Sequence, residues 1–124
     1  MFERETYEII GAAISVHNYL GCGFSEKVYQ DAFEVELKLR NIPFQREQPY
    51  KVVYNGITLK SEFIPDFVCY NKIVVELKAV REMEEIFKAQ TINYGRVAGF
   101  KLALLLNFGK ESLDYQYFPI KFNL

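Results

Sequence analysis

The sequence predicts a single α/β domain in which helices flank a central β-sheet. Apolar residues follow helical spacing at the start of the chain and again after residue 82, whereas residues 44 to 79 are rich in β-branched and aromatic side chains. A nearly continuous apolar segment follows the last helical one, as expected of a strand covered on both faces. We therefore expect the order helix, helix, three or four strands, helix and two strands.

Two helices are expected before the strands. Apolar side chains recur at i, i+4, i+7 and i+11 within residues 3 to 20, at Ile9, Ala13, Val16 and Leu20. Residues 21 to 23, Gly-Cys-Gly, interrupt this pattern, and a second periodic segment runs from Ser25 to about residue 41.

A third helix is expected over residues 83 to 98, with one apolar stripe made of Met83, Ile86, Phe87, Tyr94 and Val97. The strands before it form a meander with a tight turn at Asn55-Gly56, and its clearest member covers residues 73 to 79. Residues 101 to 107 belong at the centre of the sheet. Residues 115 to 122 form an edge strand, where Pro119 is tolerated.

Composition limits the class of protein. The 124 residues fit one domain, residues 1 to 124, and a hydrophobic fraction of 50% supports a single core. Fifteen basic and sixteen acidic residues give a formal charge of -1, which argues against a protein that coats nucleic acid through bulk charge. Two cysteines without metal-binding spacing indicate a reducing compartment, so we expect a cytoplasmic protein. No segment approaches the ~18 apolar residues of a membrane span, so no membrane contact is expected.

Two charged residues share one face of the predicted strand over residues 73 to 79. Strand alternation sends Glu76 and Lys78 to the same side, and charges in an otherwise apolar strand are costly unless they are paired or bind something. The alternative is a surface ion pair on the solvent side of the sheet, and Glu-x-Lys alone favours that alternative.

Asp66 changes this balance because it lies on the segment expected to run antiparallel beside Glu76. Two carboxylates ~4 Å apart repel by roughly 4 kcal/mol at an effective dielectric of about 20, a cost that a divalent cation removes. Oxygen ligands without Cys or His suit Mg²⁺ or Mn²⁺.

The register of the two strands decides whether this site can exist. A two-residue turn at Asn71-Lys72 would place Asp66 on the wrong face for sharing a metal with Glu76. We therefore predict either a connection that pairs Cys69 with Ile73 or a bulge near Pro65.

These residues resemble a known motif. Pro65-Asp66, nine intervening residues and then Glu76-Leu77-Lys78 are similar to the pattern of the PD-(D/E)xK nuclease superfamily. Residues 23 to 29, Gly-Phe-Ser-Glu-Lys-Val-Tyr, resemble the signature of the small GxxExxY protein family, whose members are assigned to that superfamily. The second resemblance spans essentially the whole chain, and it implies a restriction-endonuclease-like fold with a central mixed β-sheet flanked by helices.

The resemblance also implies roles for individual residues. Asp66, Glu76 and the carbonyl of Leu77 would hold Mg²⁺ or Mn²⁺, and Lys78 would position or deprotonate the attacking water. A helical Glu before the sheet often joins such a site, and Glu26 fills that place. The alternative for Glu26 is an acid favoured by the dipole of a helix N-terminus.

Gln90 falls on the apolar stripe of its predicted helix, where a buried amide needs hydrogen-bond partners. Residues 90 to 94, Gln-Thr-Ile-Asn-Tyr, resemble the Q-x-x-x-Y element of exonuclease-like branches of the superfamily. There the Gln helps to orient the site, and the Tyr, here Tyr94, approaches the nucleic-acid backbone. The alternative is a core Gln with satisfied hydrogen bonds.

Three functions remain open at this point. The first is a Mg²⁺-dependent nuclease with a nucleic-acid partner, DNA favoured over RNA. The second is a catalytically silent binding or assembly module that keeps the fold. The third is a purely structural cluster of Asp66, Glu76 and Lys78. A homodimer is compatible with the sequence, although no residue pattern specifies its interface. His17 receives no role, because a single histidine among apolar residues is more often part of a core.

Overall fold

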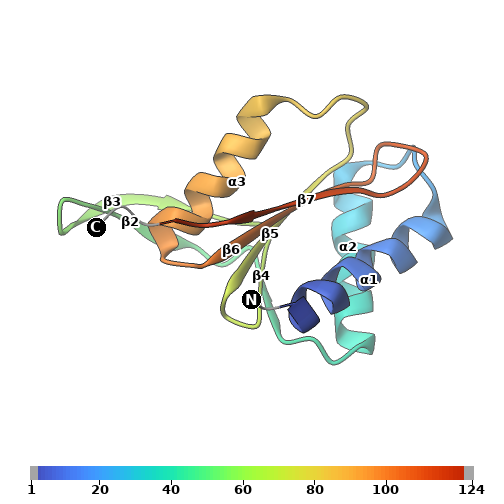
Figure 1. Cartoon of the computed structure of the whole chain (residues 1–124), viewed down its shortest axis with the longest axis horizontal. Helices are drawn as coiled ribbons and strands as arrows, with labels where there is room; N and C mark the ends of the chain where they lie inside the picture. Colours follow the sequence, from blue (N-terminus) through green and yellow to red (C-terminus); the bar gives the residue numbers. More distant parts are fainter. Residues whose placement is uncertain (1–2, 122–124) are drawn as a thin grey trace.

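The computed structural model describes residues 3 to 121, in which helices cover both faces of a β-sheet (Figure 1). Helices α1 and α2 pack on one face, and α3 packs on the other. The elements are α1 (Glu3–Leu20), α2 (Glu26–Leu39), β1 (Phe44–Arg46), β2 (Tyr50–Tyr54), β3 (Ile57–Phe63), β4 (Phe67–Cys69), β5 (Ile73–Lys78), α3 (Glu85–Ala98), β6 (Leu102–Asn107) and β7 (Asp114–Pro119). The expected α/β class with a mixed sheet is confirmed.

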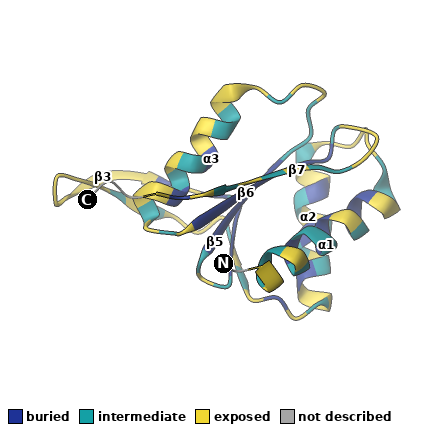
Figure 2. Ribbon diagram, in the orientation of Figure 1, coloured by how far each residue is buried: buried dark blue, intermediate teal, exposed yellow. Residues whose placement is uncertain are grey.

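The main sheet has the strand order β1-β4-β5-β6-β7. Strands β5 and β6 run parallel and the other neighbours run antiparallel, which makes the sheet mixed. Every residue of β6 is buried, as its apolar sequence predicts, and β7 lies at the border. Pro119 therefore stands on an edge strand, where a missing N–H is tolerated. Figure 2 shows β5 and β6 as the buried centre of the molecule.

Alternating residues of the central strands face two different cores. Ile73, Val75 and Leu77 lie with the buried residues of α1 and α2. Val74 lies on the other face with Val68, Ala103 and Ile120, which α3 covers. The same alternation places Glu76 and Lys78 on the α3 face.

The apolar stripe predicted for α3 is wrong in part, since Phe87 and Tyr94 are half-buried but Ile86 and Val97 are not. Ile86 is 64% exposed and Val97 is 36% exposed, whereas Thr91 and Gly95 are the buried residues. A Cβ added at Gly95 would lie 3.1 Å from the side chain of Ile120. Small residues on this side let α3 approach the sheet closely, and hydrophobic periodicity alone does not reveal a contact made by Gly and Thr.

The meander predicted between residues 44 and 79 is one long hairpin with a break in its middle. Its base, β1 with β4, belongs to the main sheet, and its distal half, β2 with β3, forms a separate two-stranded sheet that extends away from it (Figure 1). Arg46 pairs with Phe67 and Tyr50 pairs with Phe63, so the register is the same on both sides of the break. The expected single meander of three or four strands is therefore corrected to four short strands in two sheets, followed by β5.

Two prolines and a left-handed residue account for the break. Pro49 and Pro65 cannot donate a ladder hydrogen bond, and they lie in the two opposing segments that separate β1 from β2 and β3 from β4. Glu47 has a φ of 52°, which no extended strand tolerates. The turn at the tip uses Asn55 and Gly56, both at positive φ, as the Asn-Gly pair predicts.

Asn107, at the end of β6, fixes the chain that leaves β5. Its Oδ1 accepts the N–H groups of Val80 and Gly109, each at 3.0 Å, and its Nδ2 donates to the carbonyl of Val80 at 2.9 Å. Asn107 is fully buried, and a Cβ at Gly109 would lie 2.4 Å from the Val80 backbone. These three hydrogen bonds, which we call the Asn107 clasp, hold the chain at the end of the strand that carries Glu76 and Lys78.

We expect Asn107→Ala to lower the free energy of unfolding by about 1 to 3 kcal/mol, because it leaves partly buried backbone groups of Val80 and Gly109 without their side-chain partner. Urea unfolding followed by circular dichroism measures this. Asn18→Ala is the matched control, since Asn18 is exposed on α1 and its loss should change stability by less than about 0.5 kcal/mol. Equal stability of the two variants would contradict the clasp.

Candidate functional site

The carboxyl groups of Asp66 and Glu76 lie side by side on the α3 face of the sheet. Cys69 pairs with Ile73 and Phe67 pairs with Val75, which confirms the predicted register of β4 and β5. That register brings residue 66 beside residue 76 on one face.

Each carboxyl is held by a backbone N–H of the other strand. The N–H of Asp66 donates to Oε2 of Glu76 at 2.6 Å, and the N–H of Leu77 donates to Oδ2 of Asp66 at 2.8 Å. The break in the long hairpin makes these bonds available, because β4 begins at Phe67 and its ladder with β5 ends at the Phe67–Val75 pair. At the point where the strands separate, hydrogen bonds to the carboxyl groups of Asp66 and Glu76 replace the backbone ladder.

Burial makes this pair of acids unusual. Glu76 is only 6% exposed, and burial, together with the nearby charge of Asp66, raises its pKa to about 9. The pKa of Asp66 is also raised, chiefly by burial, although the hydrogen bond from Leu77 opposes the shift. The pair therefore keeps a proton near neutral pH unless a cation compensates the second charge.

Lys78 and Glu26 approach the pair from β5 and from the start of α2. The ammonium of Lys78 lies 4.3 Å from the ring centroid of Phe87 on α3. Glu26 is partly buried, and burial raises its pKa while Lys78 lowers it and Asp66 raises it. Glu26 therefore interacts with the charges of both Lys78 and Asp66. Among residues 3 to 121, however, no three Asp, Glu, His or Cys side chains stand close enough to hold one metal ion, so the structure brings together Asp66 and Glu76 only.

The loop before α2 fixes the position of Glu26. Tyr29 is fully buried, and its hydroxyl donates to the carbonyl of Gly21 at 2.5 Å and accepts the N–H of Phe24 at 3.3 Å. Its ring stacks on Phe108 with centroids 4.8 Å apart. Gly23 has a φ of 114°, a conformation that favours glycine. Each of the three spaced residues, Gly23, Glu26 and Tyr29, therefore has a distinct structural place.

Gln90 is exposed, so the prediction of a buried amide is wrong. Its Nε2 donates to the hydroxyl of Tyr94 at 2.8 Å, and Tyr94 stacks on Phe63 at 4.9 Å. The pKa of Tyr94 is raised by burial, with smaller contributions from Glu76 and Asp66. Tyr94 thus lies near the acid pair. Gln90 is linked to the pair through its hydrogen bond to Tyr94, because Thr91 and Gly95, and not Gln90, are on the buried side of α3.

Sequence reasoning missed Glu47, whose negative charge raises the pKa of Asp66 and whose N–H donates to the Asp66 carbonyl at 3.0 Å. The only signal in the sequence is Pro49, which marks a break two residues later. His17, given no role, is buried, hydrogen-bonded to the carbonyl of Lys110 at 2.8 Å and stacked on Phe108.

With this geometry established, comparison with known proteins gives the family. A model of the PD-(D/E)XK nuclease superfamily matches residues 3 to 118. The chain belongs to this superfamily. The crystal structure of the protein SSO0001 is similar in fold, with a TM-score of 0.60 and 17% sequence identity over 98% of this chain. The match covers 61% of that protein, so the chain spans about three fifths of its length.

No curated protein matches the chain. Among the described residues of this superfamily member, no helix combines the length and the hydropathy that crossing a bilayer demands.

The raised pKa of Glu76 predicts a specific pH dependence of stability. Between pH 4.5, the ordinary pKa of the group, and about pH 9, the unfolded chain has lost this proton while the folded chain retains it. Raising the pH then favours unfolding, with a slope of up to about 1.4 kcal/mol per pH unit. We expect Glu76→Gln to flatten this slope and to stabilise the protein at alkaline pH, as measured by urea unfolding across that range. Glu85→Gln, at an exposed acid, should leave the slope unchanged.

Proposed function

We propose that this chain hydrolyses phosphodiester bonds of nucleic acid with the help of a divalent metal ion. The observation that carries the proposal is the pair of buried carboxyls, Asp66 and Glu76, fixed by backbone N–H groups of adjoining strands beside Lys78. Membership of the PD-(D/E)XK superfamily supports the same reaction class.

The residues present fit a small, hard cation. Asp66 and Glu76 offer carboxylate oxygens, and the carbonyl of Leu77 is the third oxygen that we assign to the site, together with Glu26. Two acids that hold raised pKa values without a cation would both ionise next to one, so metal binding should release a proton. When bound, Mg²⁺ or Mn²⁺ polarises the phosphodiester and lowers the pKa of a coordinated water.

The remaining residues would act on the substrate and the water. Lys78 positions the water or stabilises negative charge that develops on the phosphorus oxygens. Glu26 interacts electrostatically with both Lys78 and Asp66. Gln90 orients Tyr94 toward the nucleic-acid backbone through their hydrogen bond. We further propose that the substrate is DNA in preference to RNA, that the protein acts in the cytoplasm, and that the chain is of the GxxExxY type. The structural places of Gly23, Glu26 and Tyr29 support the last of these assignments.

A specific observation favours the alternative of a catalytically silent module. The formal charge of -1 gives no general attraction to nucleic acid, and no third acid stands close enough to the Asp66–Glu76 pair, within the described residues, to complete a metal cluster. In that alternative the fold binds a partner without cleaving it.

Metal binding and cleavage distinguish these functions. We expect calorimetry to show saturable Mn²⁺ binding. Glu76→Ala should abolish this binding, whereas the Lys78→Ala variant should still bind Mn²⁺. With single-stranded, duplex and branched DNA, we expect metal-dependent cleavage that Lys78→Ala slows by at least about 100-fold. Glu85→Ala is the matched control.

Three outcomes lead to different conclusions. Metal binding without cleavage of any substrate supports the silent module. Absence of Mn²⁺ and Mg²⁺ binding leaves only a structural cluster. Cleavage that persists unchanged in both site variants indicates a contaminating nuclease.

Glu26 has a separate test. If Glu26 supports the metal site, Glu26→Gln should weaken Mn²⁺ binding by about 10- to 100-fold while the protein remains folded. If Glu26 only favours the N-terminus of α2, the substitution should lower thermal stability slightly and leave the Mn²⁺ affinity unchanged. Glu85→Gln, which removes the same charge from the exposed first turn of α3, is the matched control.

A further inference from the structure

Strand β7 is a border of the main sheet, and its outer side is unpaired within the described part of the chain. The N–H of Ile120 donates to the carbonyl of Lys101 at 2.9 Å, so it points toward the β6 side. Because successive residues of a strand point their backbone groups to alternate sides, the N–H and C=O groups of Tyr115 and Tyr117 point outward. Pro119 also faces outward, where its missing N–H costs the pairing with β6 nothing.

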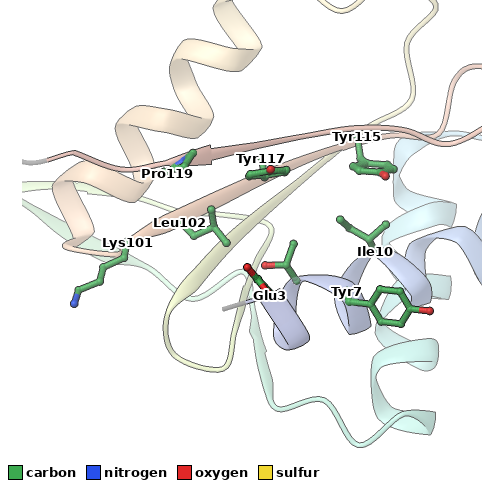
Figure 3. A pocket seen from close by; sticks show the side chains of 9 residues that line it. Glu3, Tyr7, Ile10, Lys101, Leu102, Tyr115, Tyr117 and Pro119 are labelled. Atoms are coloured by element: carbon green, nitrogen blue, oxygen red, sulfur yellow. The ribbon is translucent and has the colours of Figure 1, made fainter. Parts of the chain in front are cut away.

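A groove of about 390 Å³ runs beside this edge, on the face that carries α1 (Figure 3). Tyr7 of α1 lines one side and Tyr115 and Tyr117 line the other, and these side chains are 77%, 45% and 58% exposed. Thr6 also lines the groove, and its hydroxyl is buried without a hydrogen-bond partner among residues 3 to 121. An unpaired edge beside an exposed aromatic groove is a surface that folded proteins usually cover.

We propose that this surface binds a second copy of the chain, by antiparallel pairing of the two β7 strands about a two-fold axis at Gln116. In this arrangement Tyr115 lies opposite the partner's Tyr117, and the two residues exchange both of their N–H···O bonds. Every outward N–H of Tyr115 and Tyr117 in both copies then has an acceptor. The two main sheets become one continuous sheet.

The backbone disfavours two kinds of alternative register. Opposing residues of an antiparallel pair share a face, so a shift by one position would set outward-pointing groups against inward-pointing ones. A shift by two residues, with the axis at Tyr117, would place Pro119 opposite the partner's Tyr115. Pro119 donates no N–H, so one carbonyl of Tyr115 in each copy would lose its donor.

Side chains make a second copy a better occupant than an unrelated extended segment. The proposed register brings the tyrosines of both copies together on the α1 face, beside the two grooves, where aromatic rings bury large apolar areas. The same pairing carries Lys121, which follows β7, toward the loop that holds the partner's Glu111. A two-fold axis provides each of these contacts twice.

Sedimentation equilibrium of the full chain tests the pairing. We expect a dimer whose dissociation constant rises at least about 30-fold in Tyr117→Asp, the effect of losing a central interface aromatic. Tyr19→Asp, at a residue of α1 that is 90% exposed and outside the groove, should leave the dimer intact. Circular dichroism verifies that each variant is folded.

A double variant tests the register. Tyr115→Lys alone should also dissociate the dimer, whereas Tyr115→Lys combined with Tyr117→Asp should restore it, because the two new charges face each other across the axis. A protein that stays monomeric at every concentration overturns the proposal, as does a dimer that persists in Tyr117→Asp. A double variant that stays dissociated overturns the register. Glu76→Gln should dimerise like the unmodified protein, so this result is independent of the nuclease activity.

Discussion

The structure depends on one constraint, the burial of two neighbouring carboxyl groups at the point where a long hairpin separates from the main sheet. Asp66 and Glu76 would repel each other strongly if both were ionised without compensation. Backbone N–H groups of the opposing strand hold them in place, and a raised pKa keeps a proton on the pair. An arrangement that is costly for a structural cluster becomes favourable once a divalent cation joins it, and this difference is the physical basis of the metal site that we propose.

The rest of the fold supports that pair from several directions. Pro49, Pro65 and the left-handed Glu47 end the ladder of the hairpin and so free the N–H of Asp66 for Glu76. Asn107 clasps the chain beyond β5, and Phe87 on α3 covers the ammonium of Lys78. The candidate site lies where β4 and β5 separate, whereas the proposed interface runs along the border strand β7, with β6 between β5 and β7. The two proposals therefore concern different strands of the sheet.

Much of the site could be predicted because its residues lie on strands with a fixed period. Alternation alone places Glu76 and Lys78 on one face, and parity left two possibilities, the pairing of Cys69 with Ile73 or a bulge near Pro65. The structure has the first of these. The prediction that Gln90 is buried was wrong because helical spacing identifies only which residues share a side of the helix. Small residues such as Gly95 decide which side the sheet contacts. For Glu47 the sequence offered only the nearby Pro49, since the approach of Glu47 to Asp66 depends on its left-handed backbone conformation.

By itself, the sequence determined the fold class and the central and edge strands, because hydrophobic periodicity and local turn chemistry depend on neighbouring residues. Strand parity also restricted which carboxyl groups could lie together. Tertiary structure decided which face α3 buries, where the hairpin leaves the sheet, how strongly burial shifts the pKa of Glu76 and which strand edge remains open. Each of these depends on contacts between segments far apart in the chain, and such contacts set burial and charge that no local pattern encodes.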